Sequence, residues 1–118
     1  MTETAAPGRV LPHPDRAEIR LETVLHALSD PARLRIVREL SRAADELSCS
    51  RFELPVTKST ATHHFRVLRE SGVIRQCYRG TAKMSGLRRD DLDDLFPGLL
   101  DALLAAVEGQ YARLGEEA

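Results

Sequence analysis

Residues 57–72 hold the side chains of this chain whose types and spacing are best suited to binding chemistry. Thr57 can cap a helix and Gly72 can end it in the left-handed conformation. Apolar residues at positions 61, 65 and 68 fall on one helical face, so hydroxyls, histidines and cations occupy the other. That face offers short donors for base edges and cations for phosphates in a DNA major groove. The side chains expected to contact DNA from this helix are Thr57, Lys58, Ser59, Thr60, Thr62, His63 and Arg66.

We expect different roles within this helix. On its exposed side, the side chains at positions 58, 62 and 63 are expected to contact base edges. Thr57 and Arg66 are expected to contact phosphates. His64 falls beside the apolar positions, so we expect it to be packed and hydrogen-bonded. An ordinary solvated helix face is the alternative explanation of the same polar pattern.

Residues 73–86 have the pattern of a β-hairpin, with strands at 73–78 and 81–86 joined at Arg79-Gly80. Arg75, Arg79 and Lys83 would make this hairpin a basic wing that lies on the DNA backbone or minor groove. Plain surface charge on a sheet is the alternative.

Charge is unevenly distributed along the chain. The net charge is -1, yet residues 33–89 hold 13 Lys and Arg against 5 Asp and Glu, and residues 90–118 hold 1 against 8. The basic block contains both the helix and the hairpin, which supports a nucleic-acid partner despite the near-neutral total. Tryptophan is absent and aromatic residues make up 4%, which argues against a stacking platform for single strands.

The remaining elements must position this helix. The chain of 118 residues predicts one small domain over 15–118, preceded by a disordered arm at 1–14 that has three prolines and no helical period. Asp15 and Glu18 predict a capping box for a first helix. A second helix should start at Pro31, with a short helix or turn at 48–53 and a last helical region from 90 that breaks at 97–98.

The first helix and the segment at about 97–114 are more apolar than lone solvated helices. Because a domain of this size buries only about two-thirds of its unfolded surface, a dimer interface would add stability. Plain core is the alternative for the same leucines. The expected interface residues are Leu21, Val24, Leu25, Leu99, Leu100, Leu103, Leu104, Val107 and Tyr111.

The predicted fold is therefore mainly α with a small β-hairpin. The order α-α-α-α-β-β-α is that of a winged helix-turn-helix, here dimerising through its N- and C-terminal helices.

Two segments resemble the arsenic-repressor-like (ArsR/SmtB) family of bacterial regulators. Residues 28–40, LSDPARLRIVREL, resemble the opening pattern of that family, and residues 57–73 resemble its recognition helix. In the second segment Thr57 replaces the leading serine, and His64 stands on the family's histidine. The resemblance covers roughly residues 22–104. It implies a homodimeric repressor that binds palindromic operator DNA and releases it when an inducer binds.

The metal ligands of the family's sensors are not matched. Sensors of this family that bind soft metals carry a pair of cysteines near their short third helix. This chain has only Cys49 there, between two serines, whereas capture of a soft metal needs two or three thiolates. On the final helix the candidate zinc ligands are Asp101 and Glu108, and two carboxylates alone bind zinc poorly. We therefore expect no metal and no cofactor.

The signal that releases DNA has several candidates. Cys49 and Cys77 are too few for a disulfide scaffold, and each is either an inert small hydrophobe or a thiol sensor. Cys49 is the better sensor candidate because serines flank it. A small organic inducer in the dimer cleft, thiol chemistry, and no ligand at all stay open as alternatives.

No catalytic set is present: the chain has no Gly-rich phosphate loop and no H-E-x-x-H or C-x-x-C motif, so we expect no enzyme. No apolar run reaches the length of a membrane span, and the N-terminus lacks a signal-peptide core, so the cytoplasm is the expected location. The leading prediction is a sequence-specific regulator of double-stranded DNA that represses its own or neighbouring genes. The alternative is a winged helix that docks an acidic protein partner.

Overall fold

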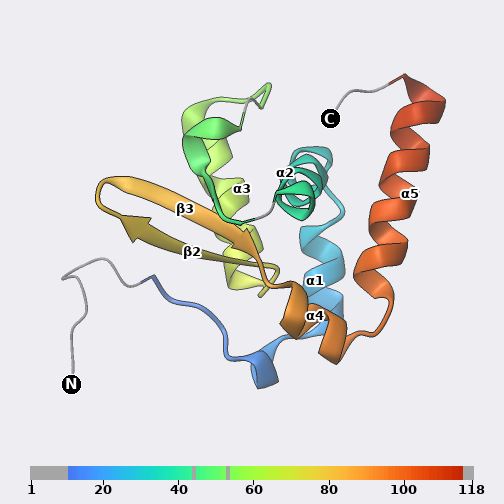
Figure 1. Cartoon of the computed structure of the whole chain (residues 1–118), viewed down its shortest axis with the longest axis horizontal. Coiled ribbons are helices and arrows are strands. Elements are labelled where there is room, and N and C mark those ends of the chain that lie inside the picture. Colours follow the sequence, from blue (N-terminus) through green and yellow to red (C-terminus); the bar gives the residue numbers. More distant parts are fainter. Residues whose placement is uncertain (1–10, 44, 53, 116–118) are drawn as a thin grey trace.

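A computed structural model describes residues 11–43, 45–52 and 54–115. The β2–β3 hairpin projects at one end of the long axis and α5 lies at the other, with α1, α2 and α3 between them (Figure 1). This is the winged helix-turn-helix that the sequence predicts. The elements in chain order are η1 (Arg16–Glu18), α1 (Leu21–Ala27), α2 (Pro31–Arg42), β1 (Leu47–Ser48), η2 (Cys49–Arg51), α3 (Lys58–Glu70), β2 (Ile74–Arg79), β3 (Ala82–Leu87), α4 (Arg89–Leu95) and α5 (Leu99–Leu114).

Side-chain caps start both helices of the helix-turn-helix. Asp30 Oδ2 accepts hydrogen bonds from the backbone nitrogens of residues 32 and 33 at 2.9 and 3.1 Å, with Pro31 in the first turn of α2. Thr57 Oγ1 accepts from the backbone nitrogen of Thr60 at 3.2 Å at the start of α3. Both predicted caps are confirmed.

Gly72 ends the turn that follows α3 and has a φ of 90°. Glycine adopts this left-handed conformation without the steric cost that other residues meet. A Cβ at this position would lie 2.6 Å from the Ile19 side chain, so the packing also requires glycine. The chain then enters β2 directly, which places the wing beside the end of the recognition helix.

The sheet has three antiparallel strands in the order β1-β3-β2. The hairpin pairs from Ile74↔Leu87 to Arg79↔Ala82, so each strand is shifted by one residue from its predicted range. The sequence predicts only a helix or turn at 48–53. The structure has β1 paired with β3 and then the 3-10 turn η2. A two-residue strand is too short to show an alternating pattern, which is why that prediction missed it.

The predicted first helix is divided in two. Its capping box forms, with the Asp15 backbone nitrogen donating to Glu18 Oε1 at 2.8 Å, but it caps only η1. Ile19 is extended and buried, and α1 starts at Leu21. The break turns Ile19 into the core beneath Gly72, and this tertiary contact outweighs the local helical preference.

Part of the predicted N-terminal arm packs on the domain. Residues 1–10 of that arm lie outside the described residues. Within residues 11–14, His13 Nε2 accepts a hydrogen bond from the backbone nitrogen of Gln76 at 2.9 Å. This strap, residues 11–14, therefore contacts the edge of β2 that faces away from β3, and such a free edge is a liability when uncovered. For these four residues the prediction of disorder is wrong.

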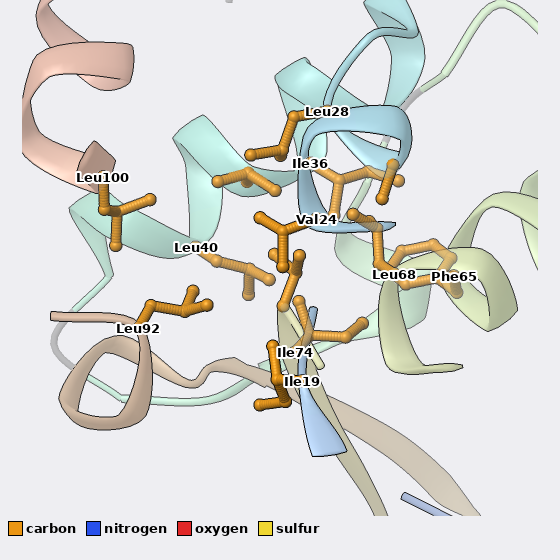
Figure 2. Packing of buried hydrophobic residues seen from close by; sticks show 13 residues of the cluster. Ile19, Val24, Leu28, Ile36, Leu40, Phe65, Leu68, Ile74, Leu92 and Leu100 are labelled. Carbon is orange, nitrogen blue, oxygen red and sulfur yellow. The ribbon is translucent and has the colours of Figure 1, made fainter. Parts of the chain in front are cut away.

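The hydrophobic core lies where α1, α2, α3 and the sheet meet. Figure 2 shows Val24 of α1, Ile36 of α2, Leu68 of α3 and Ile74 of β2 packed together, and each is at most 1% exposed. Leu92 and Leu100 of the two last helices extend the same cluster. Burial of each such side chain contributes roughly 1.5–3 kcal/mol, so this cluster fixes the position of α3.

The predicted dimer residues divide into three groups by exposure. Four of them are buried at 1–8% exposure within the single chain, so their surface is largely covered without a partner: Val24, Leu100, Val107 and Tyr111. Leu21 and Leu25 are 42% and 43% exposed on α1. Three residues of α5 are partly buried: Leu99, Leu103 and Leu104.

Candidate nucleic-acid interface

The outer face of α3 is polar and exposed along its whole length. The helix packs on the core through Phe65 and Leu68, which are 4% and 0% exposed. The seven side chains predicted for DNA contact are all exposed. Within the described ranges Lys58 and Arg66 have no ion-pair partner, so their charges are available to a ligand.

The hydroxyls of this face also hydrogen-bond locally. Thr57 Oγ1 lies 2.9 Å from Thr60 Oγ1 and 3.3 Å from Ser59 Oγ, and Thr62 Oγ1 donates to the backbone oxygen of Lys58 at 3.0 Å. These bonds hold the side chains in place at the first turns of α3. Thr57 Oγ1 donates to Thr60 Oγ1 and accepts from the Thr60 backbone nitrogen and Ser59 Oγ, whereas the oxygens of Ser59, Thr60 and Thr62 each keep a lone pair that can accept from a ligand.

A buried pair of side chains fixes how α3 sits on α2. Arg33 is 8% exposed, and its Nε donates to the backbone oxygen of Ala27 at 2.6 Å. Its Nη1 lies 3.1 Å from Nδ1 of His64, which is also 8% exposed. The predicted packed role of His64 is confirmed. The contact joins the two segments that resemble the regulator family, because Arg33 belongs to one and His64 to the other.

A groove of about 400 Å³ runs between α3 and the wing. The helix contributes Lys58 and Thr62 to its lining, the wing contributes Thr81 and Lys83, and the turn before α3 contributes Cys49. The exposed face of α3 and one side of the wing therefore form a single continuous surface, as a double-helical ligand requires.

The strand register separates the three wing cations. Directly paired residues point to the same face of a sheet, so Lys83 lies with Tyr78 on one face. This face is turned toward α3, because Lys83 lines the groove between α3 and the wing. Lys83 Nζ lies 5.9 Å from the centre of the Tyr78 ring. Arg75 and Arg79 lie on the opposite face, because side chains alternate along a strand. The sequence predicts one basic wing from these three cations, whereas the structure places Lys83 on one face of the sheet and the two arginines on the other.

Glu46 is a site residue that sequence reasoning missed. Its side chain is 9% exposed, and its Oε1 accepts from Nε and Nη2 of Arg79 at 3.1 and 2.8 Å. Its Oε2 lies 3.6 Å from Nε of Arg75. The hydrogen bond to Glu46 raises the pKa of Arg79. A carboxylate 33 positions away in sequence thus neutralises part of the wing, and no local pattern signals it.

A buried polar network connects the end of α3 to the sheet. Arg69 Nη1 donates to Gln76 Oε1 at 2.7 Å, and Gln76 Nε2 donates to Ser85 Oγ at 3.1 Å. Arg69 Nε also donates to the backbone oxygen of Pro12 in the strap at 3.2 Å. All three polar side chains of the network are at most 7% exposed. The network therefore ties the wing and the strap to the recognition helix.

The two cysteines lie on opposite faces of the sheet. Cys49 Sγ is 3.4 Å from Ser85 Oγ and within 3.6 Å of Gln76 Nε2, on the face toward α3. Cys77 Sγ is 3.8 Å from a Glu46 oxygen on the other face. Burial and then the Glu46 charge raise the pKa of Cys77, which disfavours its reactive thiolate. This placement also opposes a disulfide between the two thiols.

The described part of the chain contains no group of three His, Cys, Asp or Glu side chains that could hold a metal ion. The two carboxylates of α5 that were candidate zinc ligands each pair with an arginine. Asp101 Oδ1 accepts from Arg89 at 3.0 Å, and Glu108 binds Arg38 through both oxygens. None of the described helices is long and apolar enough to cross a membrane.

Known proteins share this sequence pattern and fold. A helix-turn-helix domain family matches residues 28–77. The chain is 37% identical over 82 residues to the uncharacterized HTH-type transcriptional regulator YceK of Bacillus subtilis (strain 168), covering 68% of this chain and 82% of that protein. A solved structure of an ArsR-like transcriptional regulator from Rhodococcus sp. RHA1 aligns with a TM-score of 0.55 and 25% identity, covering 79% of this chain and 83% of that one.

A second solved structure, of an ArsR family transcriptional regulator, aligns with a TM-score of 0.57 over 78% of this chain and 96% of that one. At 21% identity it shows likeness of fold alone. Fold and surface together define a helix-turn-helix DNA-binding protein. The chain belongs to the ArsR-like helix-turn-helix transcriptional regulators, and it is a regulator rather than an enzyme.

Proposed function

We propose that this regulator is a homodimeric repressor that places α3 in the major groove of a palindromic operator. The observation that carries this proposal is the exposed face of α3. Its hydroxyls, and its cations that have no ion-pair partner among the described residues, continue across a groove onto the wing. Lys58, Thr62 and His63 read base edges, while Thr57 and Arg66 bind phosphates. Ser59 and Thr60 lie in the first turn of α3 and add contacts to the DNA backbone.

The wing adds phosphate contacts beside the recognition helix. Lys83 is on the face toward α3 and is the wing cation best placed for this role. Arg75 and Arg79 bind phosphates only by exchanging them for the carboxylate of Glu46. The wing is therefore weaker in DNA binding than its cation count suggests, because part of its charge is already neutralised.

Dimerisation is proposed through α1 and α5. Leu21 and Leu25 are large apolar side chains that α1 leaves exposed. The partly buried leucines of α5, at positions 99, 103 and 104, extend the apolar surface. Two copies joined in this way present two recognition helices, which must meet successive major grooves roughly 34 Å apart. Sedimentation of Leu25→Glu tests the interface, and an unchanged dimer would contradict it.

The DNA-binding proposal is tested with a duplex from the gene's own promoter region. We expect binding that weakens steeply with salt, and loss of sequence preference in Lys58→Ala/His63→Ala. The matched control is Arg20→Ala/His26→Ala, which removes a cation and an imidazole from exposed positions of η1–α1. Retained preference in the first variant would contradict the assignment. Binding without preference even in the wild type would favour the acidic-partner alternative.

The genes that this repressor controls are proposed to be its own and its neighbours, and the cytoplasm is where it meets them. A small-molecule inducer is the release signal that we favour over thiol chemistry. The raised pKa of Cys77 counts against that thiol, while Cys49 at the groove between α3 and the wing keeps the thiol route open.

A further inference from the structure

His13 lies in the strap, residues 11–14, and both nitrogens of its ring form hydrogen bonds. Nε2 lies 2.9 Å from the backbone nitrogen of Gln76 in β2. Because a backbone N–H can only donate, Nε2 accepts and carries no hydrogen. Nδ1 lies 2.8 Å from the backbone oxygen of Leu11, which can only accept, so the hydrogen of the ring is on Nδ1. The contact of the strap with β2 therefore requires the neutral form of His13.

A proton on Nε2 is incompatible with this contact. It would place a second N–H against the N–H of Gln76, so two donors would face each other without an acceptor. The charged groups that act on the ring are the guanidinium groups of Arg69 on α3 and Arg88 before α4. Arg88 is paired with Asp91 of α4 at 2.9 Å, and β2 contributes the neutral Gln76 to the contact. An imidazolium in this position would therefore lose its bond to β2 and lie near two cations.

The surroundings of the bound strap oppose protonation of the ring. Burial is the largest cause and lowers the pKa of His13, the hydrogen bond to Leu11 raises it, and the charges of Arg69 and Arg88 lower it, for a net pKa below 6.5. In the released strap the ring is in water, where its pKa returns to about 6.5. Release of the strap therefore takes up a proton at a pH between these two pKa values, and acid favours it.

The strap is bound to the buried network that joins the recognition helix to the wing. Arg69 Nε donates to the backbone oxygen of Pro12 at 3.2 Å, while its Nη1 donates to Gln76 Oε1 at 2.7 Å. Gln76 Nε2 in turn donates to Ser85 Oγ of β3 at 3.1 Å. Arg69 and Gln76 are 7% and 2% exposed. Release of the strap removes a partner from each of them at the point where α3 meets β2.

We propose that the strap is a pH-sensitive switch at the junction of α3 and the wing. Protonation of His13 Nε2 detaches the strap from the edge of β2 and leaves the wing less firmly fixed on α3. The bond from Arg88 Nη1 to the backbone oxygen of Pro14, at 2.9 Å, does not involve the imidazole and holds the other end of the strap. A wing that must be ordered on binding costs affinity, so acid weakens DNA binding. This regulatory role rests on the proposed DNA-binding function.

Release of the strap is tested on the free full chain by NMR hydrogen exchange of the Gln76 amide. With the intrinsic effect of pH on exchange removed, protection should be constant above pH 6.5. Below that pH it should fall about tenfold for each pH unit, down to the folded-state pKa of His13, because one proton is taken up on opening. The amide of Leu68, in the core of α3, should stay better protected throughout. Protection of Gln76 that is independent of pH, or equal to that of Leu68, would overturn the proposal.

Two variants of His13 have opposite expected effects. Glutamine extends as far as Nε2 and accepts through its carbonyl oxygen at every pH, so His13→Gln should keep the protection of Gln76 constant. Alanine offers no acceptor, so His13→Ala should show the low protection of the released strap at every pH. The matched control His26→Gln removes an exposed imidazole from α1 and should keep the wild-type profile. A wild-type profile in His13→Ala would assign the pH dependence to another group and overturn the proposal.

The regulatory part is tested separately, with the promoter duplex. His63 on the recognition surface also changes DNA affinity with pH, and comparison of the wild type with His13→Gln removes that contribution. The wild type should bind several-fold more weakly than His13→Gln at about pH 5 and equally well at about pH 7.5. Equal affinities at the lower pH would overturn the regulatory role. Because hydrogen exchange is measured without DNA, failure of the DNA-binding proposal leaves the release of the strap intact.

Discussion

Replacement of Glu46 by glutamine measures how far the wing is held back from DNA. Glu46 binds Arg79 through Oε1 at 2.8 and 3.1 Å, and its Oε2 lies 3.6 Å from Arg75. Glutamine keeps the shape and a carbonyl acceptor, so the strand pairing is retained. It removes the charge with which a DNA phosphate must compete for the two arginines.

The expected magnitude follows from counterion release. Each phosphate that a protein neutralises steepens the dependence of log affinity on log salt by about 0.9. One more phosphate contact in each of the two wings of a dimer steepens the salt dependence by about 1.8 in total. For each tenfold dilution of salt, the affinity of Glu46→Gln for DNA should therefore rise about 60-fold more than that of the wild type.

The assay is fluorescence anisotropy of a labelled promoter duplex over a series of salt concentrations. Glu22→Gln is the matched control, because it removes the same charge from an exposed position on α1. It should shift affinity slightly and leave the slope unchanged. A slope in Glu46→Gln that stays the same or becomes shallower would refute the reasoning. It would show that Glu46 holds the arginines ready for phosphates rather than competing with them.

Two further predictions concern stability. Gly72→Ala should lower the free energy of unfolding by about 2–5 kcal/mol, because alanine meets both the left-handed backbone and Ile19. Gly80→Ala, with φ 64° and nothing within 4 Å, should lose only about 1–2 kcal/mol in the same urea denaturation, and equal losses would contradict this. Burial, followed by two nearby arginines, lowers the pKa of His13 below 6.5, so the unfolded chain takes up its proton more readily. The contribution of neutral His13 to the free energy of unfolding should be complete above pH 6.5 and decline as the pH falls toward the folded-state pKa. In urea denaturation, His13→Gln should remove this pH dependence. An unchanged pH profile in the variant would show that the strap is not its source.

The recognition helix could be predicted because its signals are local. The cap at Thr57, the apolar face and the terminating Gly72 all act within a few residues of one another. The hairpin was predicted for the same reason, to within one residue. Recognition of the family rests on the same local patterns, and the contact between Arg33 and His64 explains why its two segments occur together.

The errors concern features that distant contacts decide. Ile19 breaks the first helix because it fills the space over Gly72. β1 exists only because β3 offers a partner. Apolar residues of similar sequence character divide into core and surface according to how α1 and α5 pack, so Val24 is buried while Leu25 is exposed.

Periodicity, capping and charge distribution are properties of short stretches of chain, and they predicted the fold class and the helix that is proposed to face DNA. Which wing cations pair with a carboxylate and which leucines are exposed depend on groups tens of residues apart. The pairing of Glu46 with the wing arginines and the pocket between α2, α3 and α5 that His64 lines form only when the packed helices and strands bring such groups within a few ångströms. Electrostatic and hydrogen-bond energies change steeply over that distance, so only the tertiary structure could reveal them.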